Sequence, residues 1–153
     1  YVSTPAPVVD EILRLARVGR DDTVYDLGWG DGRIVIAAAR DFGARGVGIG
    51  LDPRRIDEAK AGAAAAGVAD RLRFVVRDLF ESDFSEASVV TLYLFPELNA
   101  RLRPKLLAEL KPGARIVSHQ FLIGDWAPEG IERVSAGTMD HALYLYVVPK
   151  PPR

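Results

Sequence analysis

Apolar and polar positions alternate between a helical and a strand period along most of the chain. After Pro5 and Pro7, apolar residues recur at helical spacing and predict a first helix that ends near Gly19. Short β-branched and aromatic runs predict five strands, at residues 23–27, 46–51, 73–76, 89–95 and 115–121. Helical patterns separate these runs, at residues 34–42, 54–66 and 96–110. Residues 131–136 and 142–148 predict a closing antiparallel pair around a turn at residues 137–140.

Strands that alternate with helices are typical of a mostly parallel sheet with helices on both faces. The five alternating strands and the closing pair predict a sheet of seven strands. The chain has 153 residues, of which 48% are apolar and 27% charged, which is the profile of one globular domain. We therefore expect a single α/β domain over residues 1–153.

Charge and composition narrow the possible partners. The 20 basic and 21 acidic residues give a net charge of −1, so we expect no nucleic-acid partner held by overall charge. The absence of cysteine excludes disulfides, thiolate zinc sites and cysteine nucleophiles, and two separate histidines predict no histidine metal site. The apolar runs are too short to cross a bilayer, and no basic-then-apolar leader opens the chain. These features predict a cytoplasmic protein without structural metal.

A glycine-rich loop follows the first predicted strand. Asp26 stands near the end of that strand, and Gly28, Gly30 and Gly32 precede a helix. Glycine is needed where a turn demands positive φ or where a ligand approaches the backbone. The pattern therefore predicts a nucleotide-type binding site.

The spacing of the glycines distinguishes between cofactors. Dinucleotide dehydrogenases use G-x-G-x-x-G, whereas this loop reads G-x-G-x-G and is flanked by Asp26 and Asp31. Two carboxylates would repel a diphosphate and attract the α-ammonium group of an amino-acid moiety. The loop favours S-adenosylmethionine over NAD, and a nicotinamide-dependent oxidoreductase becomes a distant alternative.

The segment VYDLGWGDGRIVIAAA resembles motif I of the class I S-adenosylmethionine-dependent methyltransferases. The segments GVGIGLDPRRI, RFVVRDLF and VVTLYLFPELNARLRPKLLAELKPGARIVS continue this resemblance over nearly the whole chain. The opening YVSTP and the run TLYLFPELN are similar to small bacterial relatives of the ATP synthase c-subunit lysine methyltransferases. The resemblance implies a Rossmann-like sheet of order 3-2-1-4-5-7-6, S-adenosylmethionine as cofactor, S-adenosylhomocysteine as product and a protein lysine as a candidate acceptor.

The resemblance also assigns cofactor contacts. Asp26 and the loop glycines would hold the methionine end, while Asp78 would face the adenine amine with Leu79 against the ring. For Asp78 the alternative is a solvated carboxylate at a strand end. Thr4 could reach the cofactor carboxylate, and it could equally start the first helix.

Two positions depart from the family pattern. Gly50 stands where the second strand of the family ends in an acidic residue that takes both ribose hydroxyls, and Trp29 stands where a small side chain is usual. Asp52 is the nearest carboxylate, but it is better placed to cap the next helix, which Pro53 would start. The two changes are either unrelated drift or a joint alteration of the pocket, by engineering or selection. The second case leaves open a non-catalytic binding module for an adenosyl or other flat ligand.

Methyl transfer requires the protein to align donor and acceptor and to exclude water. Tyr93 and Glu97, at and just beyond the end of the fourth predicted strand, are the candidate catalytic residues of the acceptor channel. The alternatives are a core tyrosine and an exposed glutamate at a helix start. His119 could act as a base, or it could be a satisfied histidine at a strand end.

Overall fold

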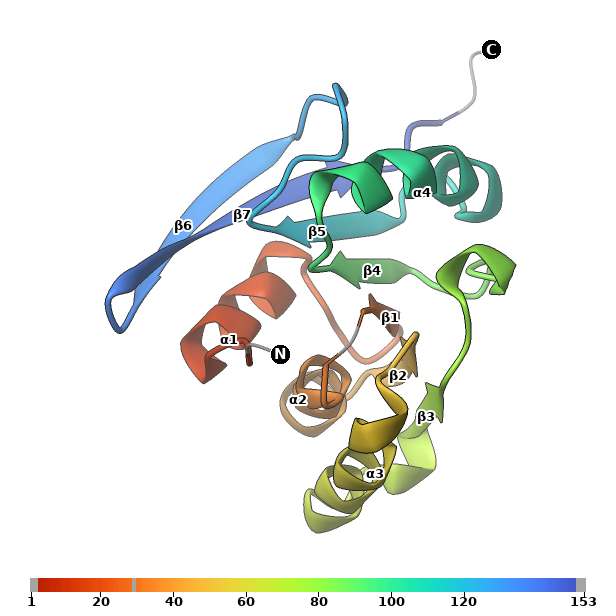
Figure 1. Cartoon of the computed structure of the whole chain (residues 1–153), viewed down its shortest axis with the longest axis vertical. Helices are drawn as coiled ribbons and strands as arrows, with labels where there is room; N and C mark the ends of the chain where they lie inside the picture. Colours follow the sequence, from red (N-terminus) through yellow and green to blue (C-terminus); the bar gives the residue numbers. More distant parts are fainter. Residues whose placement is uncertain (1–2, 29, 151–153) are drawn as a thin grey trace.

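The computed structural model describes residues 3–28 and 30–150 and shows a seven-stranded sheet (Figure 1). Its strand order is β3-β2-β1-β4-β5-β7-β6, as the resemblance implied. The strands are β1 (Thr23–Leu27), β2 (Arg45–Ile49), β3 (Leu72–Val75), β4 (Val89–Leu92), β5 (Arg115–His119), β6 (Gly130–Ala136) and β7 (Met139–Val147). The first five pair in parallel, and β7 is antiparallel to both β5 and β6. The predicted α/β class and Rossmann-like topology are confirmed.

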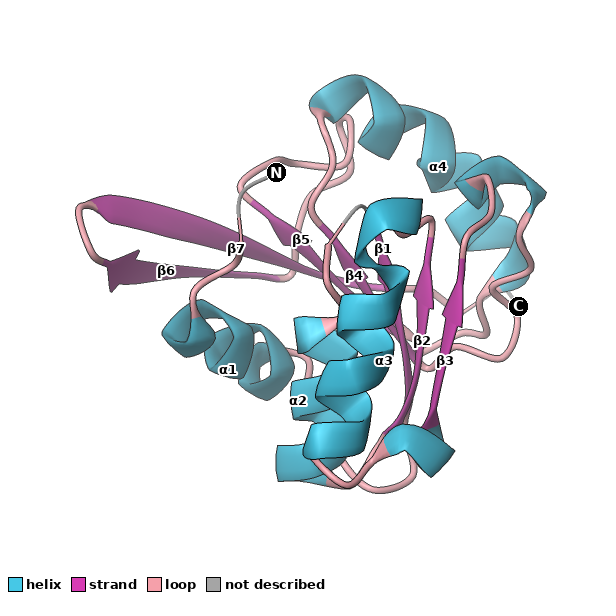
Figure 2. Cartoon of the chain, turned by 60° about the horizontal axis from the view of Figure 1, so that its bottom comes forward, coloured by secondary structure: helices cyan, strands magenta, loops and turns pink. Residues whose placement is uncertain are grey.

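Helices cover both faces of the sheet. They are α1 (Ala6–Leu15), α2 (Arg33–Phe42), α3 (Ile56–Ala65) and α4 (Pro96–Glu109). Figure 2 shows α1, α2 and α3 on one face and α4 on the other. Successive strand residues point to opposite faces, so neighbours in β1 enter different cores. Val24 joins the cluster under α1, α2 and α3, whereas Tyr25 joins the cluster under α4.

Several boundaries differ from those predicted by the hydrophobic pattern. The first helix ends at Leu15 rather than near Gly19, because Arg17 adopts φ 55° and its N–H donates to the carbonyl of Arg14. The N–H of Val18 donates to the carbonyl of Leu13, which completes a left-handed helix end without glycine. Strand β4 ends at Leu92, earlier than predicted. Strand β7 already begins at Met139, so the hairpin turn between β6 and β7 is shorter than predicted.

The helix predicted over residues 54–66 begins with a short 3-10 turn, η1 (Pro53–Arg55), before α3. Asp52 caps this turn by accepting a hydrogen bond from the backbone N–H of Arg54 at 3.0 Å. The predicted capping role of Asp52 is therefore confirmed. Across residues 3–28 and 30–150, the helices are all too short or too polar to cross a membrane.

Candidate active site

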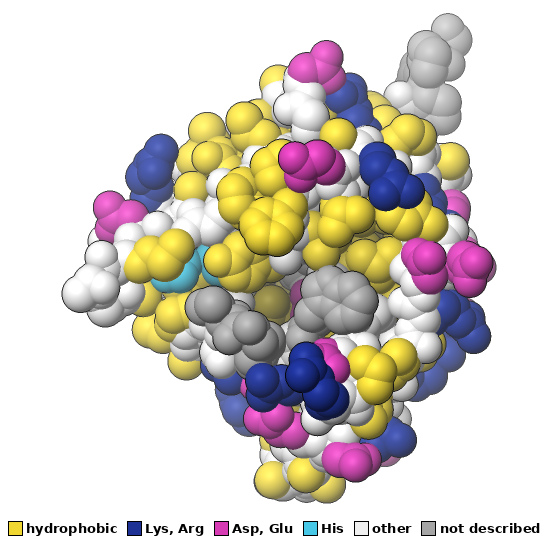
Figure 3. All heavy atoms as spheres, in the orientation of Figure 1, with side chains coloured by type: hydrophobic (Ala, Val, Ile, Leu, Met, Phe, Trp, Pro, Cys, Tyr) yellow, Lys and Arg dark blue, Asp and Glu magenta, His cyan; other side chains and the backbone are white. Residues whose placement is uncertain are grey.

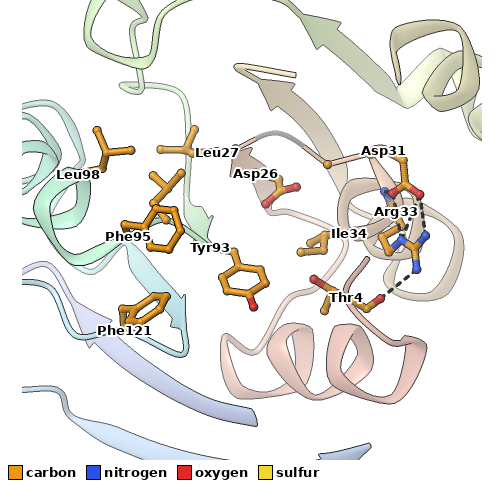
Figure 4. A pocket seen from close by; sticks show the side chains of 14 residues that line it. Thr4, Asp26, Leu27, Asp31, Arg33, Ile34, Tyr93, Phe95, Leu98 and Phe121 are labelled. Carbon is orange, nitrogen blue, oxygen red and sulfur yellow. Dashed lines mark hydrogen bonds and ion pairs between the residues drawn. The ribbon is translucent and has the colours of Figure 1, made fainter. Parts of the chain in front are cut away.

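A cavity of about 330 Å³ lies at the C-terminal ends of β1 and β4. The strand order reverses between β1 and β4, because the chain continues from β1 toward β2 and β3 on one side and from β4 toward β5 on the other. Open α/β sheets bind ligands at such a switch point. Figure 4 shows that polar side chains and aromatic rings occupy different parts of its wall. The lining residues are Thr4, Asp26, Leu27, Gly28, Gly30, Asp31, Gly32, Arg33, Ile34, Tyr93, Leu94, Phe95, Leu98 and Phe121.

Asp26 is one of two partly buried carboxylates that line this cavity, together with Asp31. It faces Thr91 across the β1–β4 pair, and the Thr91 hydroxyl donates a hydrogen bond of 2.7 Å to Asp26 Oδ1. Burial raises the pKa of Asp26 to about 6; the Thr91 hydrogen bond opposes this rise and the nearby Asp31 carboxylate adds to it. At neutral pH the cavity therefore holds a poorly solvated negative charge, which a ligand ammonium group would stabilise.

The loop glycines serve different purposes. Among the described residues beyond the chain neighbours, a Cβ built at Gly30 meets no atom within 4 Å, and one built at Gly28 meets only Leu94 Cδ2, at 3.9 Å. The described residues therefore leave space on the cavity side of these two glycines. Gly32 has φ 81°, and a Cβ there would lie 2.7 Å from the Phe74 ring. Gly32 is needed for close packing of α2 against β3, a role that the loop spacing alone did not separate from ligand contact.

Thr4 belongs to the cavity wall and not to a helix cap. Pro5 is the N-cap of α1, and no side chain caps that end. The helix-start alternative for Thr4 is therefore wrong, while its contact with the cofactor stays a prediction. The carbonyl of Thr4 accepts a hydrogen bond of 3.0 Å from the Arg33 guanidinium, which also pairs with Asp31 at 2.6 Å. The sequence did not identify Arg33 or Thr91, because the contacts of Arg33 with Thr4 and of Thr91 with Asp26 join residues that only the fold brings near.

The residues assigned to the adenosine half lie outside the lining of this cavity. Gly50 and Leu79 are neighbours, since a Cβ at Gly50 would lie 2.9 Å from Leu79 Cδ2 and 3.5 Å from the carbonyl of Gly28. Asp78 is exposed and accepts a hydrogen bond of 2.9 Å from the backbone N–H of Phe80, so it caps the short turn η3 (Leu79–Glu81). The expected contact of Asp78 with adenine stays a prediction.

Asp52 has a partner of its own in the structure. It pairs with the Arg54 guanidinium at 2.7 Å, and the hydrogen bonds from Arg54 lower its pKa to about 2. The absence of a ribose carboxylate at Gly50 stays a prediction. Trp29, the second departure from the family pattern, lies outside the described residues.

Aromatic rings form the opposite wall of the cavity. Tyr93 lines it together with Phe95 and Phe121, whose ring centroids are 6.0 Å apart. Phe95 is 69% exposed, and hydrophobic side chains cover much of the upper part of the face shown in Figure 3. Glu97 is exposed in the first turn of α4 and is not a lining residue. Of the two candidate catalytic residues, only Tyr93 reaches the cavity.

The two histidines, far apart in sequence, are brought together by the β5–β7 pairing. His119 Nε2 lies 2.7 Å from His141 Nδ1, and both side chains are buried. Burial and the neighbouring His141 lower the pKa of His119 to about 4. Within the described part of the chain, no group of three or more side chains is arranged to hold a metal ion.

Comparison with known proteins decides the family. Residues 26–130 match the ANTKMT methyltransferase domain. The chain belongs to this methyltransferase family. It is 49% identical to a protein-lysine N-methyltransferase of Saccharolobus islandicus, over 97% of this chain and 92% of that protein. It is 36% identical to the ATP synthase c-subunit lysine N-methyltransferase of Xenopus laevis, over 86% of this chain and 57% of that protein.

Solved structures agree with this assignment. The fold matches that of an RNA methyltransferase from Salinibacter ruber in complex with S-adenosyl-L-homocysteine, with a TM-score of 0.90 and 51% identity. The match covers 99% of this chain and 97% of that one. The methyltransferase is therefore an S-adenosylmethionine-dependent enzyme. Its cavity has chemical groups that suit this cofactor, because the Asp26 carboxylate can accept hydrogen bonds from an ammonium group and Gly28 and Gly30 carry no side chain.

Proposed function

We propose that this methyltransferase transfers a methyl group from S-adenosylmethionine to the side-chain amine of a protein lysine. The observation that carries the proposal is the aromatic wall of Tyr93, Phe95 and Phe121 opposite Asp26. Apolar rings suit the aliphatic stem of a lysine. The names of the relatives from Saccharolobus islandicus and Xenopus laevis support the same acceptor.

The polar side of the cavity would hold the cofactor. When bound, S-adenosylmethionine supplies a reactive methyl group on a sulfonium. Asp26, which the hydrogen bond from Thr91 holds in place, would accept hydrogen bonds from the ammonium group of the cofactor. Gly28 and Gly30 would let the methionine moiety approach the backbone, and Thr4 would face its carboxylate.

The aromatic side would prepare the acceptor. A lysine amine must be neutral to attack, and an apolar environment lowers its pKa because it disfavours the charged form. Tyr93, Phe95 and Phe121 would provide that environment and exclude water from the reacting atoms. Tyr93 would contact the acceptor directly. Glu97 has no part in this scheme, because it lies outside the cavity wall.

RNA methylation is the second candidate, since the Salinibacter ruber relative is described as an RNA methyltransferase. The surface beside the cavity favours the lysine acceptor. Phe95 on the cavity wall is exposed, and the Arg33 guanidinium at the cavity is paired with Asp31. A phosphate backbone is bound by clustered cations, whereas the cavity wall of Phe95 and Phe121 presents apolar side chains.

Labelling experiments separate the two acceptors. The protein would be incubated with methyl-labelled S-adenosylmethionine and a lysine-rich protein mixture, the same mixture with its lysine amines acetylated, or a pool of structured RNA. We expect label only in the unmodified protein mixture, and mass spectrometry should locate it as Nε-methyllysine. Label in the RNA alone would overturn the lysine proposal.

The departure at Gly50 yields a separate prediction about cofactor affinity. We expect Gly50→Glu to bind S-adenosylhomocysteine about tenfold more tightly than Gly50→Ala, because the new carboxylate can accept charge-assisted hydrogen bonds from the ribose hydroxyls. Both variants carry the same strain at φ 81° and the same contact with Leu79, so alanine isolates the effect of the carboxylate. Isothermal titration calorimetry measures both dissociation constants, and equal values would refute an altered ribose site.

If Gly50 and Trp29 together alter one pocket, their effects on cofactor affinity should be coupled in a double-mutant cycle. Additive effects would instead indicate two unrelated substitutions.

The cytoplasmic location and the single-domain organisation remain predictions of the sequence.

A further inference from the structure

The aromatic wall depends on a tyrosine whose hydroxyl makes no hydrogen bond to another described side chain. Tyr93 follows the end of β4, outside the hydrogen-bonded ladder of the sheet. Its ring packs against the imidazole of His119, with the centroids 4.0 Å apart and the planes tilted by 40°. Among the described residues, His119 is the aromatic side chain whose ring packs against Tyr93.

His119 is in turn held by a second histidine. It is 2% exposed at the end of β5, and its Nε2 makes a hydrogen bond of 2.7 Å with His141 Nδ1 on β7. Its own Nδ1 is buried and has no hydrogen-bond partner among the described residues. If Nε2 were the acceptor, Nδ1 would carry a buried proton without an acceptor. Orphaned buried N–H groups are rarer than orphaned acceptors, so we assign the proton to His119 Nε2, which donates to His141.

This arrangement keeps the imidazole neutral and its orientation fixed. A second proton on His119 would occupy the unpartnered Nδ1, and both burial and His141 disfavour it. The titratable groups that face His119 are Tyr93, from the segment after β4, and His141, from β7. The His119 imidazole therefore adds no charge behind Tyr93 at neutral pH.

We propose that His119 is a positioning residue for the acceptor, which holds the Tyr93 ring in the cavity wall while His141 fixes the imidazole. The inference rests on the proposed lysine methylation, since it concerns the wall opposite the cofactor side. It assigns His119 no contact with the cofactor or with the reacting atoms.

Two substitutions separate the ring contact from the hydrogen bond. His119→Phe keeps an aromatic ring against Tyr93 and loses the donor to His141, whereas His119→Gln keeps an N–H donor and loses the ring. We expect His119→Gln to lower kcat/KM for the lysine-rich protein mixture about tenfold, and His119→Phe to stay within about threefold of the wild type. Both should bind S-adenosylhomocysteine within about twofold of the wild type, because His119 itself does not line the cavity.

The Tyr93→Ala variant tests whether the effect of His119→Gln on kcat/KM depends on Tyr93. In Tyr93→Ala, the further change His119→Gln should have no effect on kcat/KM. Thermal unfolding of each variant shows that it is folded. An equal loss in both His119 variants, a parallel loss of cofactor affinity, or an unchanged tenfold effect in the Tyr93→Ala background would overturn the positioning role.

An acceptor-independent measurement completes the test. The ring signals of Tyr93 in an NMR spectrum, assigned from their absence in Tyr93→Phe, should shift in His119→Gln and stay near their wild-type positions in His119→Phe. Unshifted signals in His119→Gln would refute the inference even if no acceptor is methylated. A wild type that methylates no lysine, with the Tyr93 signals responding as expected, would instead refute the proposed function.

Discussion

Asp26→Asn should weaken the binding of S-adenosylhomocysteine by about 10- to 100-fold and make the cofactor-free protein more stable. The affinity falls because a charge-assisted hydrogen bond to the ligand ammonium is lost, which costs about 1.5–3 kcal/mol. The stability rises because the partly buried carboxylate, with its pKa raised to about 6, is better tolerated as a neutral group. Asparagine can still accept the hydrogen bond that Thr91 donates.

The pH dependence gives the sign of the stability change. Folded Asp26 holds its proton more tightly than the unfolded chain, so the wild type loses stability as the pH rises from about 4 to above 6. A pKa difference of about two units corresponds to at most about 3 kcal/mol, which Asp26→Asn should recover at pH 8 and not at pH 4. Urea unfolding at both pH values measures this difference.

Asp52→Asn is the matched control. The pKa of Asp52 is lowered rather than raised, so loss of its charge should reduce stability at neutral pH and leave cofactor affinity unchanged.

The wild type should also bind S-adenosylhomocysteine more weakly below pH 6, by about tenfold per pH unit, as Asp26 takes up its proton. Asp26→Asn with undiminished affinity would show that the carboxylate does not hold the ligand.

Gly28→Val should abolish binding of S-adenosylhomocysteine without unfolding the protein. Gly28 lines the cavity, and a Cβ built there meets, among the described residues beyond its chain neighbours, only Leu94 Cδ2 within 4 Å. A β-branched side chain therefore occupies the approach path of the ligand, and it also strains the backbone, because φ 150° is a conformation that side-chain-bearing residues rarely adopt. Calorimetry measures the affinity, and thermal unfolding measures the strain.

Gly67→Val provides the comparison for this second variant. Gly67 also has a positive φ, 74°, and open space around a new Cβ, but it follows α3 and does not line the cavity. It should lose stability through backbone strain and keep full cofactor affinity. Retained affinity in Gly28→Val, or an equal loss in Gly67→Val, would contradict the placement of the ligand beside the loop.

The sequence by itself determined the fold class and indicated Asp26 and the loop glycines, which line the cavity of the candidate site. Strand β1 was predicted over the residues that form it, because strand periodicity and a following glycine are local signals. Asp26 and the loop glycines were found in the same way, and motifs spread along the chain indicated the strand order. The end of the first helix was missed, because Arg17 adopts the left-handed conformation usually marked by glycine.

The tertiary structure decided which residues meet at the candidate site. Thr91 meets Asp26, Arg33 holds the carbonyl of Thr4, and His119 pairs with His141, each across a long separation in sequence. These contacts depend on which strands pair and in which register, and no short window of residues carries that information. Burial, which raises the pKa of Asp26 and lowers that of His119, likewise exists only once the sheet and its helices have closed around them.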